Sequence, residues 1–202
     1  MFMSGFGIIV LFDILTILKY NRPLNLRKNK ERTKEKSMKL KVILLILMFI
    51  SNIFASDFDI NKLTQDEIET LKEIKKQGQE HGLSYSLMAI AIKESSLGKY
   101  LVNVDTKDYG LYQAHIKTVI DRQNEKDTSW NRNKLAMKLI SDFNFATKNA
   151  IDELEYWQKI HKNDWSKVWS SYNGGWKYNS KEAKLYSQEI ASIIRELRKI
   201  EV

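Results

Sequence analysis

Glu94 stands at the end of an apolar segment, where a carboxyl group can be tuned for proton transfer. The segment begins at Leu87, and Glu94 is followed by Ser95 and a second serine. An apolar environment disfavours the charged form of a carboxylic acid and therefore raises its pKa. Such a group keeps a proton near neutral pH and can deliver it to a poor leaving group. The simpler interpretation is a solvated glutamate at a helix end, paired with Lys93 or Lys99.

Two polar, glycine-containing segments follow downstream. Residues 108–113 read Asp-Tyr-Gly-Leu-Tyr-Gln, and residues 171–175 read Ser-Tyr-Asn-Gly-Gly. Glycine lets the backbone approach a ligand closely, and Gln and Asn side chains both donate and accept hydrogen bonds. With Glu94 they indicate a site that protonates a polar substrate. The structural alternatives are a turn-forming Asp108 bonded to local backbone and a helix-terminating turn at residues 173–175.

These segments resemble the motifs of the lysozyme-like soluble lytic transglycosylases (SLT domain). That family carries a Glu-Ser pair, a Gly-Leu-Met-Gln turn, an Ala-x-Asn-x-Gly loop and a late Glu-Thr-x-x-Tyr. Here the pair is Glu94-Ser95, the turn is residues 110–113, the loop is residues 171–175 and the late motif is residues 182–186. The resemblance covers roughly residues 64–200 and is closest to the small specialised enzymes of secretion and conjugation systems.

The resemblance implies an all-α, lysozyme-like fold and a peptidoglycan lytic transglycosylase. Such an enzyme cleaves the MurNAc–GlcNAc β-1,4 bond and forms 1,6-anhydro-MurNAc without consuming water. In the family mechanism one glutamate, here Glu94, protonates the leaving oxygen and then takes a proton from the C6 hydroxyl. No cofactor is implied.

The resemblance also assigns supporting roles around Glu94. Gln113 and the backbone near Gly110 would line the floor of the cleft, and Asn173 would hold the substrate near the cleaved bond. Tyr186 would donate a hydrogen bond to Glu94. The expected substrate-binding or supporting set is Ser95, Asp108, Gly110, Gln113, Tyr172, Asn173 and Tyr186.

Asp108 departs from the commonest family pattern and leaves the reaction open. Many members carry serine at this position, whereas residues 108–113 resemble the Asp-Tyr-Gly-Ile-Leu-Gln stretch of c-type lysozymes, whose Asp is the second catalytic carboxylate. A hydrolysing muramidase that uses Glu94 and Asp108 is therefore the first alternative; lysozyme is the standard example of such a carboxylate pair. The second alternative is a non-catalytic, glycan-binding assembly protein that kept the fold.

Charge is concentrated near the start of the chain. Residues 1–55 carry ten Lys or Arg and three Asp or Glu, whereas residues 56–202 carry 23 and 22. Because the remainder is nearly neutral, the sequence argues against a nucleic-acid partner. Residues 38–55 have the basic start, apolar middle and small final residue of a signal peptide. The alternative is an uncleaved anchor, although the apolar part is short for a membrane span. Residues 1–37 are then either an over-extended N-terminus or a cytoplasmic tail.

We therefore expect residues 56–202 to form one lysozyme-like domain, exported to the periplasm, with no stable membrane span in the mature form. Apolar spacing predicts helices from Thr64 to near Gly82, from residue 84 to 94, from 111 to 122 and over most of 134–200, with at most a minimal β-hairpin around 99–109. The three histidines lack metal-ligand spacing, so no metal is predicted. The expected partners are peptidoglycan strands and a secretion, conjugation or flagellar apparatus of the cell envelope.

Overall fold

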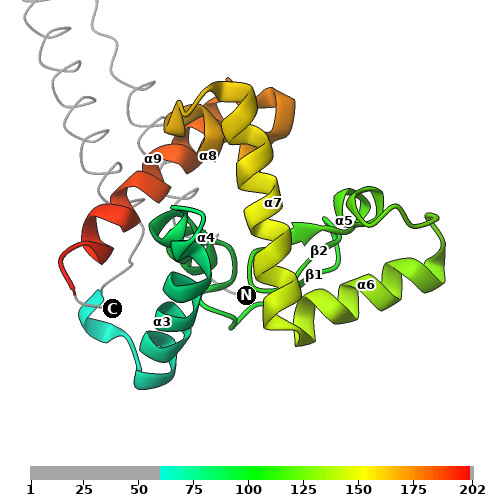
Figure 1. Cartoon of the computed structure of the whole chain (residues 1–202), viewed down its shortest axis with the longest axis horizontal. Coiled ribbons are helices and arrows are strands. Elements are labelled where there is room, and N and C mark those ends of the chain that lie inside the picture. The colour runs from blue at the N-terminus through cyan, green and yellow to red at the C-terminus, as the bar shows by residue number, and fades with distance from the viewer. Residues whose placement is uncertain (1–59, 201–202) are drawn as a thin grey trace, which may run out of the picture. The chain divides into compact units, whose positions relative to one another are not determined.

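The computed structural model describes residues 60–200, so the expected signal peptide at 38–55 and the segment 1–37 lie outside the described residues. Within this range the chain is mainly helical (Figure 1). No helix here is long and apolar enough to span a membrane. The helices are η1 (Ile60–Lys62), α3 (Gln65–Gln79), α4 (Ser84–Ser95), α5 (Ile116–Arg122), α6 (Ser129–Ser141), α7 (Phe143–His161), α8 (Trp165–Gly174), η2 (Gly175–Lys177) and α9 (Lys181–Leu197).

Helix α4 is the most deeply buried helix of this domain. Its central residues, from Leu87 to Ala91, have no exposed surface, and α4 packs against α3, α7 and α9. The preceding helix α3 begins with the predicted capping box, in which Thr64 and Glu67 satisfy each other's backbone N–H groups. Helix α4 ends at Ser96, whose left-handed conformation stops the helix one residue after Ser95. Glu94 thus lies in the last turn of a helix whose centre is fully buried.

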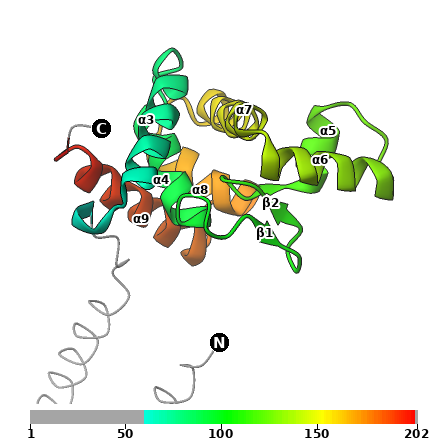
Figure 2. The ribbon, with the colours of Figure 1, turned by 90° about the horizontal axis from the view of Figure 1, so that it is seen from below.

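Two hydrophobic cores lie on opposite sides of the domain. The larger one joins α3, α4, α7, α8 and α9, and the smaller one joins α5 and α6. Figures 1 and 2 show α5 and α6 projecting away from α3, α4 and α9, with α7 between the two groups. The smaller core consists of Ile116, Val119, Ile120, Leu135, Ala136 and Leu139.

A small antiparallel sheet, in the order β1-β2-β3, connects the two groups of helices. Its strands are β1 (Val102–Asn103), β2 (Asp108–Tyr109) and β3 (Ala114–His115). The sequence predicted at most a hairpin near 99–109 and a helix from residue 111. The helix prediction was wrong at its start, because Leu111 and Tyr112 belong to a turn and the third strand precedes α5. The all-α, lysozyme-like fold class is confirmed.

Gly110 is required by the turn that follows β2. Its φ of +81° lies in the left-handed region, and a Cβ atom at this position would lie 2.3 Å from the carbonyl oxygen of Leu139 in α6. Any side chain would therefore push α6 away from the turn. Gly82 has a similar φ of +66°, but an added Cβ would meet no atom within 4 Å.

The contact at Leu139 should make Gly110→Ala much more harmful than Gly82→Ala. Gly82→Ala should cost about 1 kcal/mol of unfolding free energy because of its positive φ. Gly110→Ala adds a steric clash and should cost about 3 kcal/mol or more. Urea denaturation of both variants measures this difference. Equal losses would show that the turn does not pack tightly against α6.

Candidate active site

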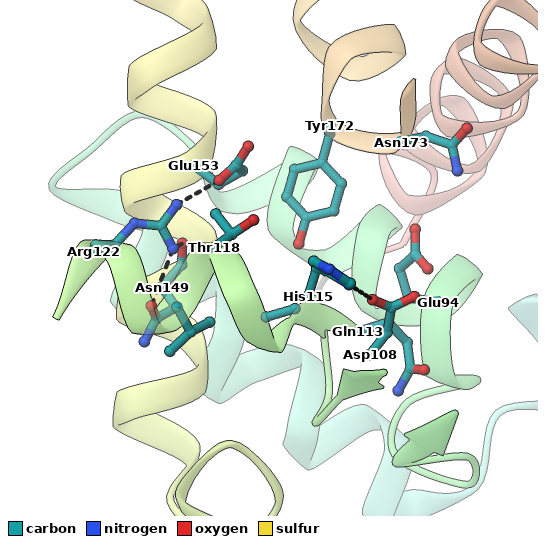
Figure 3. A pocket seen from close by; sticks show the side chains of 12 residues that line it. Glu94, Asp108, Gln113, His115, Thr118, Arg122, Asn149, Glu153, Tyr172 and Asn173 are labelled. Carbon is teal, nitrogen blue, oxygen red and sulfur yellow. Dashed lines mark hydrogen bonds and ion pairs between the residues drawn. The ribbon is translucent and has the colours of Figure 1, made fainter. Parts of the chain in front are cut away.

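A pocket opens between the two groups of helices, with the small sheet beside it (Figure 3). Glu94 comes from α4, and Tyr172 and Asn173 come from α8. The opposite wall is formed by α5 and α7, which contribute Arg122 and Glu153. The full lining is Glu94, Asp108, Gln113, Ala114, His115, Thr118, Val119, Arg122, Asn149, Glu153, Tyr172 and Asn173. The pocket is therefore polar and carries two carboxylates at the end that faces α4.

The Glu94 carboxyl group is held in a protonatable state. Burial at the end of α4 raises its pKa to about 7, a hydrogen bond from Tyr186 opposes this rise, and the negative charge of Asp108 adds to it. Lys93 lowers the pKa only slightly; it pairs with Glu189 at 2.7 Å. Near neutral pH the carboxyl group of Glu94 is thus populated in both forms, as an acid that must later act as a base requires.

Tyr186 fixes the orientation of the Glu94 carboxyl group. Its hydroxyl, on α9, donates to Oε1 of Glu94 at a distance of 2.5 Å. The Tyr186 side chain is only 6% exposed, and burial raises the pKa of this phenol well above its usual value. Tyr186 therefore remains a hydrogen-bond donor throughout the pH range in which Glu94 titrates.

Asp108 and His115 form a pair across two strands of the sheet. They are directly opposed residues of β2 and β3, and Nδ1 of His115 lies 2.9 Å from Oδ1 of Asp108. Both side chains line the pocket together with Glu94, as Figure 3 shows. The second carboxylate of the site is therefore held by a histidine.

Gln113 stabilises the turn and offers only part of its amide to a ligand. Its Nε2 donates to the carbonyl oxygens of Gly110, at 2.9 Å, and Tyr100, at 3.1 Å. Both amide hydrogens are thus engaged with backbone, which leaves the amide oxygen for a substrate. Gln113 has a positive φ of 47°, consistent with its place in a tight turn.

Ser95 supports the site from behind. Its hydroxyl is fully buried, donates to the carbonyl oxygen of Leu111 at 2.7 Å and accepts from the backbone N–H of Gly98 at 3.0 Å. This hydroxyl ties the end of α4 to the turn that carries Gly110. Ser95 therefore positions Glu94 and does not face the pocket.

Tyr172 and Asn173 belong to the last turn of α8 and not to a loop. The hydroxyl of Tyr172 donates to the carbonyl oxygen of Tyr112 at 3.0 Å, which links α8 to the turn. Asn173 is exposed at the rim of the pocket. Gly174 lets α8 approach α9, because a Cβ there would lie 2.9 Å from the Cβ of Ala183.

The residues expected from the sequence fall into two groups in the structure. Five of them line the pocket, namely Glu94, Asp108, Gln113, Tyr172 and Asn173. The other three, Ser95, Gly110 and Tyr186, lie behind the pocket and make the contacts described above. The expected set thus contains both surface residues of the site and the residues that support them.

The wall formed by α5 and α7 was missed. There the Arg122 guanidinium donates to Oδ1 of Asn149 at 3.1 Å and pairs with Glu153, while Nε1 of Trp157 donates to Glu153 at 2.6 Å. Asn149, Glu153 and Trp157 recur at intervals of four residues on α7, where Asn149 and Trp157 are buried and Glu153 is partly buried. This polar row was the available signal, because polar groups within a buried stripe need partners.

Removing the charge of Glu94 should stabilise the protein selectively at higher pH. A carboxyl group whose pKa is raised from 4.5 to about 7 contributes stability below pH 4.5 that is lost as the pH rises through 7. Glu94→Gln should therefore gain roughly 1–3 kcal/mol of unfolding free energy relative to wild type between pH 4 and 8. Urea titrations across this range measure the gain, and Glu189→Gln, with no such gain, is the matched control. If the difference in unfolding free energy between Glu94→Gln and wild type did not change with pH, the raised pKa of Glu94 would be contradicted.

Tyr186→Phe should raise the pKa of Glu94 further. The phenol stabilises the ionised carboxylate, so its removal leaves burial less opposed. NMR titration of the ¹³C-labelled Glu94 carboxyl measures the pKa directly. Tyr172→Phe is the control, because its hydroxyl bonds a backbone oxygen and its loss should leave the Glu94 titration unchanged. A lower pKa of Glu94 in Tyr186→Phe than in wild type would show that the phenol does not stabilise the Glu94 carboxylate.

The comparison with known proteins agrees with this geometry. The chain is 34% identical over 127 residues to the "Uncharacterized 20.7 kDa protein in vs-regB intergenic region" of Enterobacteria phage T4. The match covers 60% of this chain and 64% of the phage protein, so the chain spans less than two thirds of that relative. No solved structure matches the chain. Residues 72–194 match the family described as "Transglycosylase SLT domain", and this range contains Glu94, the turn and Tyr186. The chain therefore belongs to the transglycosylase SLT domain family.

Proposed function

We propose that this protein is a peptidoglycan lytic transglycosylase that cleaves the MurNAc–GlcNAc β-1,4 bond and forms 1,6-anhydro-MurNAc. The observation that carries the proposal is the Glu94 carboxyl group, which lines the pocket with a pKa raised to about 7. Membership of the SLT family supports peptidoglycan as the substrate class. The polar lining of the pocket suits a glycan, whose hydroxyl and amide groups need hydrogen-bond partners.

The proposed reaction uses Glu94 twice. Protonated Glu94 gives its proton to the glycosidic oxygen, the bond from C1 of MurNAc to that oxygen breaks, and positive charge develops at C1. The resulting carboxylate then accepts the proton of the C6 hydroxyl while O6 bonds to C1. Glu94 is protonated again at the end and no water is consumed. A pKa of about 7 suits both steps, because the group is readily protonated and readily deprotonated.

Asp108 supplies the electrostatic support for the developing positive charge. It lines the same pocket as Glu94, and its charge already contributes to the raised pKa of Glu94. A fixed anion at a site partly screened from water stabilises a nearby cation strongly. The same position favours a second candidate function, a hydrolysing muramidase, in which water replaces the C6 hydroxyl in the second step.

The setting of this activity is also part of the proposal. Peptidoglycan is reached only outside the cytoplasmic membrane, so we propose that the signal-like segment 38–55 directs export to the periplasm. We further propose that the activity opens the wall locally for a secretion, conjugation or flagellar apparatus of the envelope. A non-catalytic, glycan-binding role would leave the tuned pKa of Glu94 without a purpose.

Mass spectrometry of muropeptides released from purified sacculi tests the proposal. The wild-type protein should release products that end in 1,6-anhydro-MurNAc, and Glu94→Gln should reduce the release by about 1000-fold or more, because the proton donor is lost. Glu189→Gln makes the same chemical change on α9, outside the pocket, and should keep most of the activity.

The products decide between the candidate functions. Reducing-end MurNAc would identify a hydrolase and would make Asp108 a direct participant. Equal release by wild type and Glu94→Gln would refute the role of Glu94. Binding to sacculi without release by either protein would favour the non-catalytic alternative.

A further inference from the structure

Asp108 is bonded by the imidazole of His115, a contact that the proposed reaction does not by itself require. A carboxylate in this pocket could be held by any hydrogen-bond donor, yet the donor here is an imidazole, which can gain a proton near neutral pH. His115 lies directly opposite Asp108 in the sheet and its side chain is half exposed to the pocket. Its partner is less exposed, at 25%.

The hydrogen bond defines the chemical state of the pair. An ionised carboxylate only accepts hydrogen bonds, so Nδ1 of His115 must carry the hydrogen that Oδ1 of Asp108 accepts at 2.9 Å. In the neutral imidazole the other nitrogen, Nε2, is then unprotonated. The bond to Nδ1 persists when the imidazole gains a proton, because both nitrogens are donors in that form. His115 can thus donate this hydrogen bond to Asp108 in either form of its ring.

Other charged groups around the pocket do not replace this donor. Arg122, the guanidinium on the opposite wall, is engaged with Asn149 and Glu153. Within residues 60–200, His115 is the side chain that bonds the Asp108 carboxylate. The titratable groups that face His115 across the pocket are Asp108 from β2, Glu94 from α4, Arg122 from α5, Glu153 from α7 and Tyr172 from α8.

We propose that His115 is a positioning residue for Asp108, holding its carboxylate directed into the pocket beside Glu94. This inference rests on the proposed cleavage reaction. The oriented anion stabilises the positive charge at C1 of the sugar when the glycosidic bond breaks. The hydrogen bond from Nδ1 of His115 keeps Oδ1 of Asp108 in this direction.

Matched variants separate the position of the donor from the presence of an imidazole. The amide nitrogen of His115→Asn can occupy the place of Nδ1, whereas His115→Gln moves the amide one bond further out. His115→Asn should keep kcat at pH 7 within about 3-fold, because its amide can donate to Asp108 from the same place. His115→Gln should lose about 10-fold in kcat, a change of roughly 1.4 kcal/mol, with KM almost unchanged.

A double-mutant cycle with Asp108→Asn tests whether His115 acts through Asp108. If it does, His115→Gln with Asp108→Asn should be no slower than Asp108→Asn alone. Multiplied losses in the double variant would overturn the proposal, and so would equal losses of kcat in His115→Asn and His115→Gln. Thermal unfolding of each variant identifies losses that come only from misfolding.

A readout that does not need turnover separates this proposal from the proposed function. ¹⁵N NMR of the imidazole nitrogens, assigned with His115→Asn, should show neutral His115 as the Nδ1–H tautomer in the wild type, and this preference should disappear in Asp108→Asn. A wild-type Nε2–H tautomer would refute the positioning role even in an active enzyme. If the wild-type protein were inactive but showed the Nδ1–H tautomer, the proposed reaction would be refuted. The positioning of Asp108 by His115 would still stand.

Discussion

The burial of one carboxyl group at the end of a buried helix governs the architecture of this site. The centre of helix α4 is apolar and buried, and Glu94 follows it in the last turn of the helix. Leaving a carboxylate there costs free energy, and the Tyr186 hydroxyl offsets only part of this cost. The same burial keeps a proton on Glu94 near neutral pH. The position that lowers the stability of the fold is therefore also the position of the tuned carboxyl group.

A continuous set of close contacts transmits the position of α4 to the rest of the pocket. The Ser95 hydroxyl bonds the backbone of Leu111, and the neighbouring Gly110 lies directly under the backbone of Leu139 in α6. The hydroxyl of Tyr172, on α8, donates to the backbone oxygen of Tyr112 in the same turn. The turn thus serves as the common support of three helices. A glycine at residue 110 and a buried serine at residue 95 therefore matter as much to the geometry as the carboxylates do.

The sequence predicted those parts of the molecule that local patterns encode. Helices, caps and the short motifs around Glu94 are written in consecutive residues, so the helical fold and the five expected pocket residues could be found without a structure. The sequence allowed a small two- or three-stranded hairpin near residues 99–109, but it did not place a strand at residues 114–115. Two-residue strands have no periodicity of their own and depend on pairing with distant residues. Arg122 and Glu153 were missed for a related reason, since their importance comes from a contact between two helices. Asp108 was recognised, but its partner in the sheet became visible only through the register of β2 and β3.

The unequal size of the two cores has a consequence for how the site opens. The α5–α6 lobe is held by six buried residues and by the contacts of Arg122 with α7, whereas the Glu94 wall rests on the larger core. Local unfolding free energy follows the apolar surface that a segment buries, so the small lobe should open far more often than the whole domain unfolds. Backbone amides of α5 and α6 would then exchange with solvent faster than those of α4. The α5 side of the pocket would therefore be the more easily displaced one, and the α4 side the more rigid one.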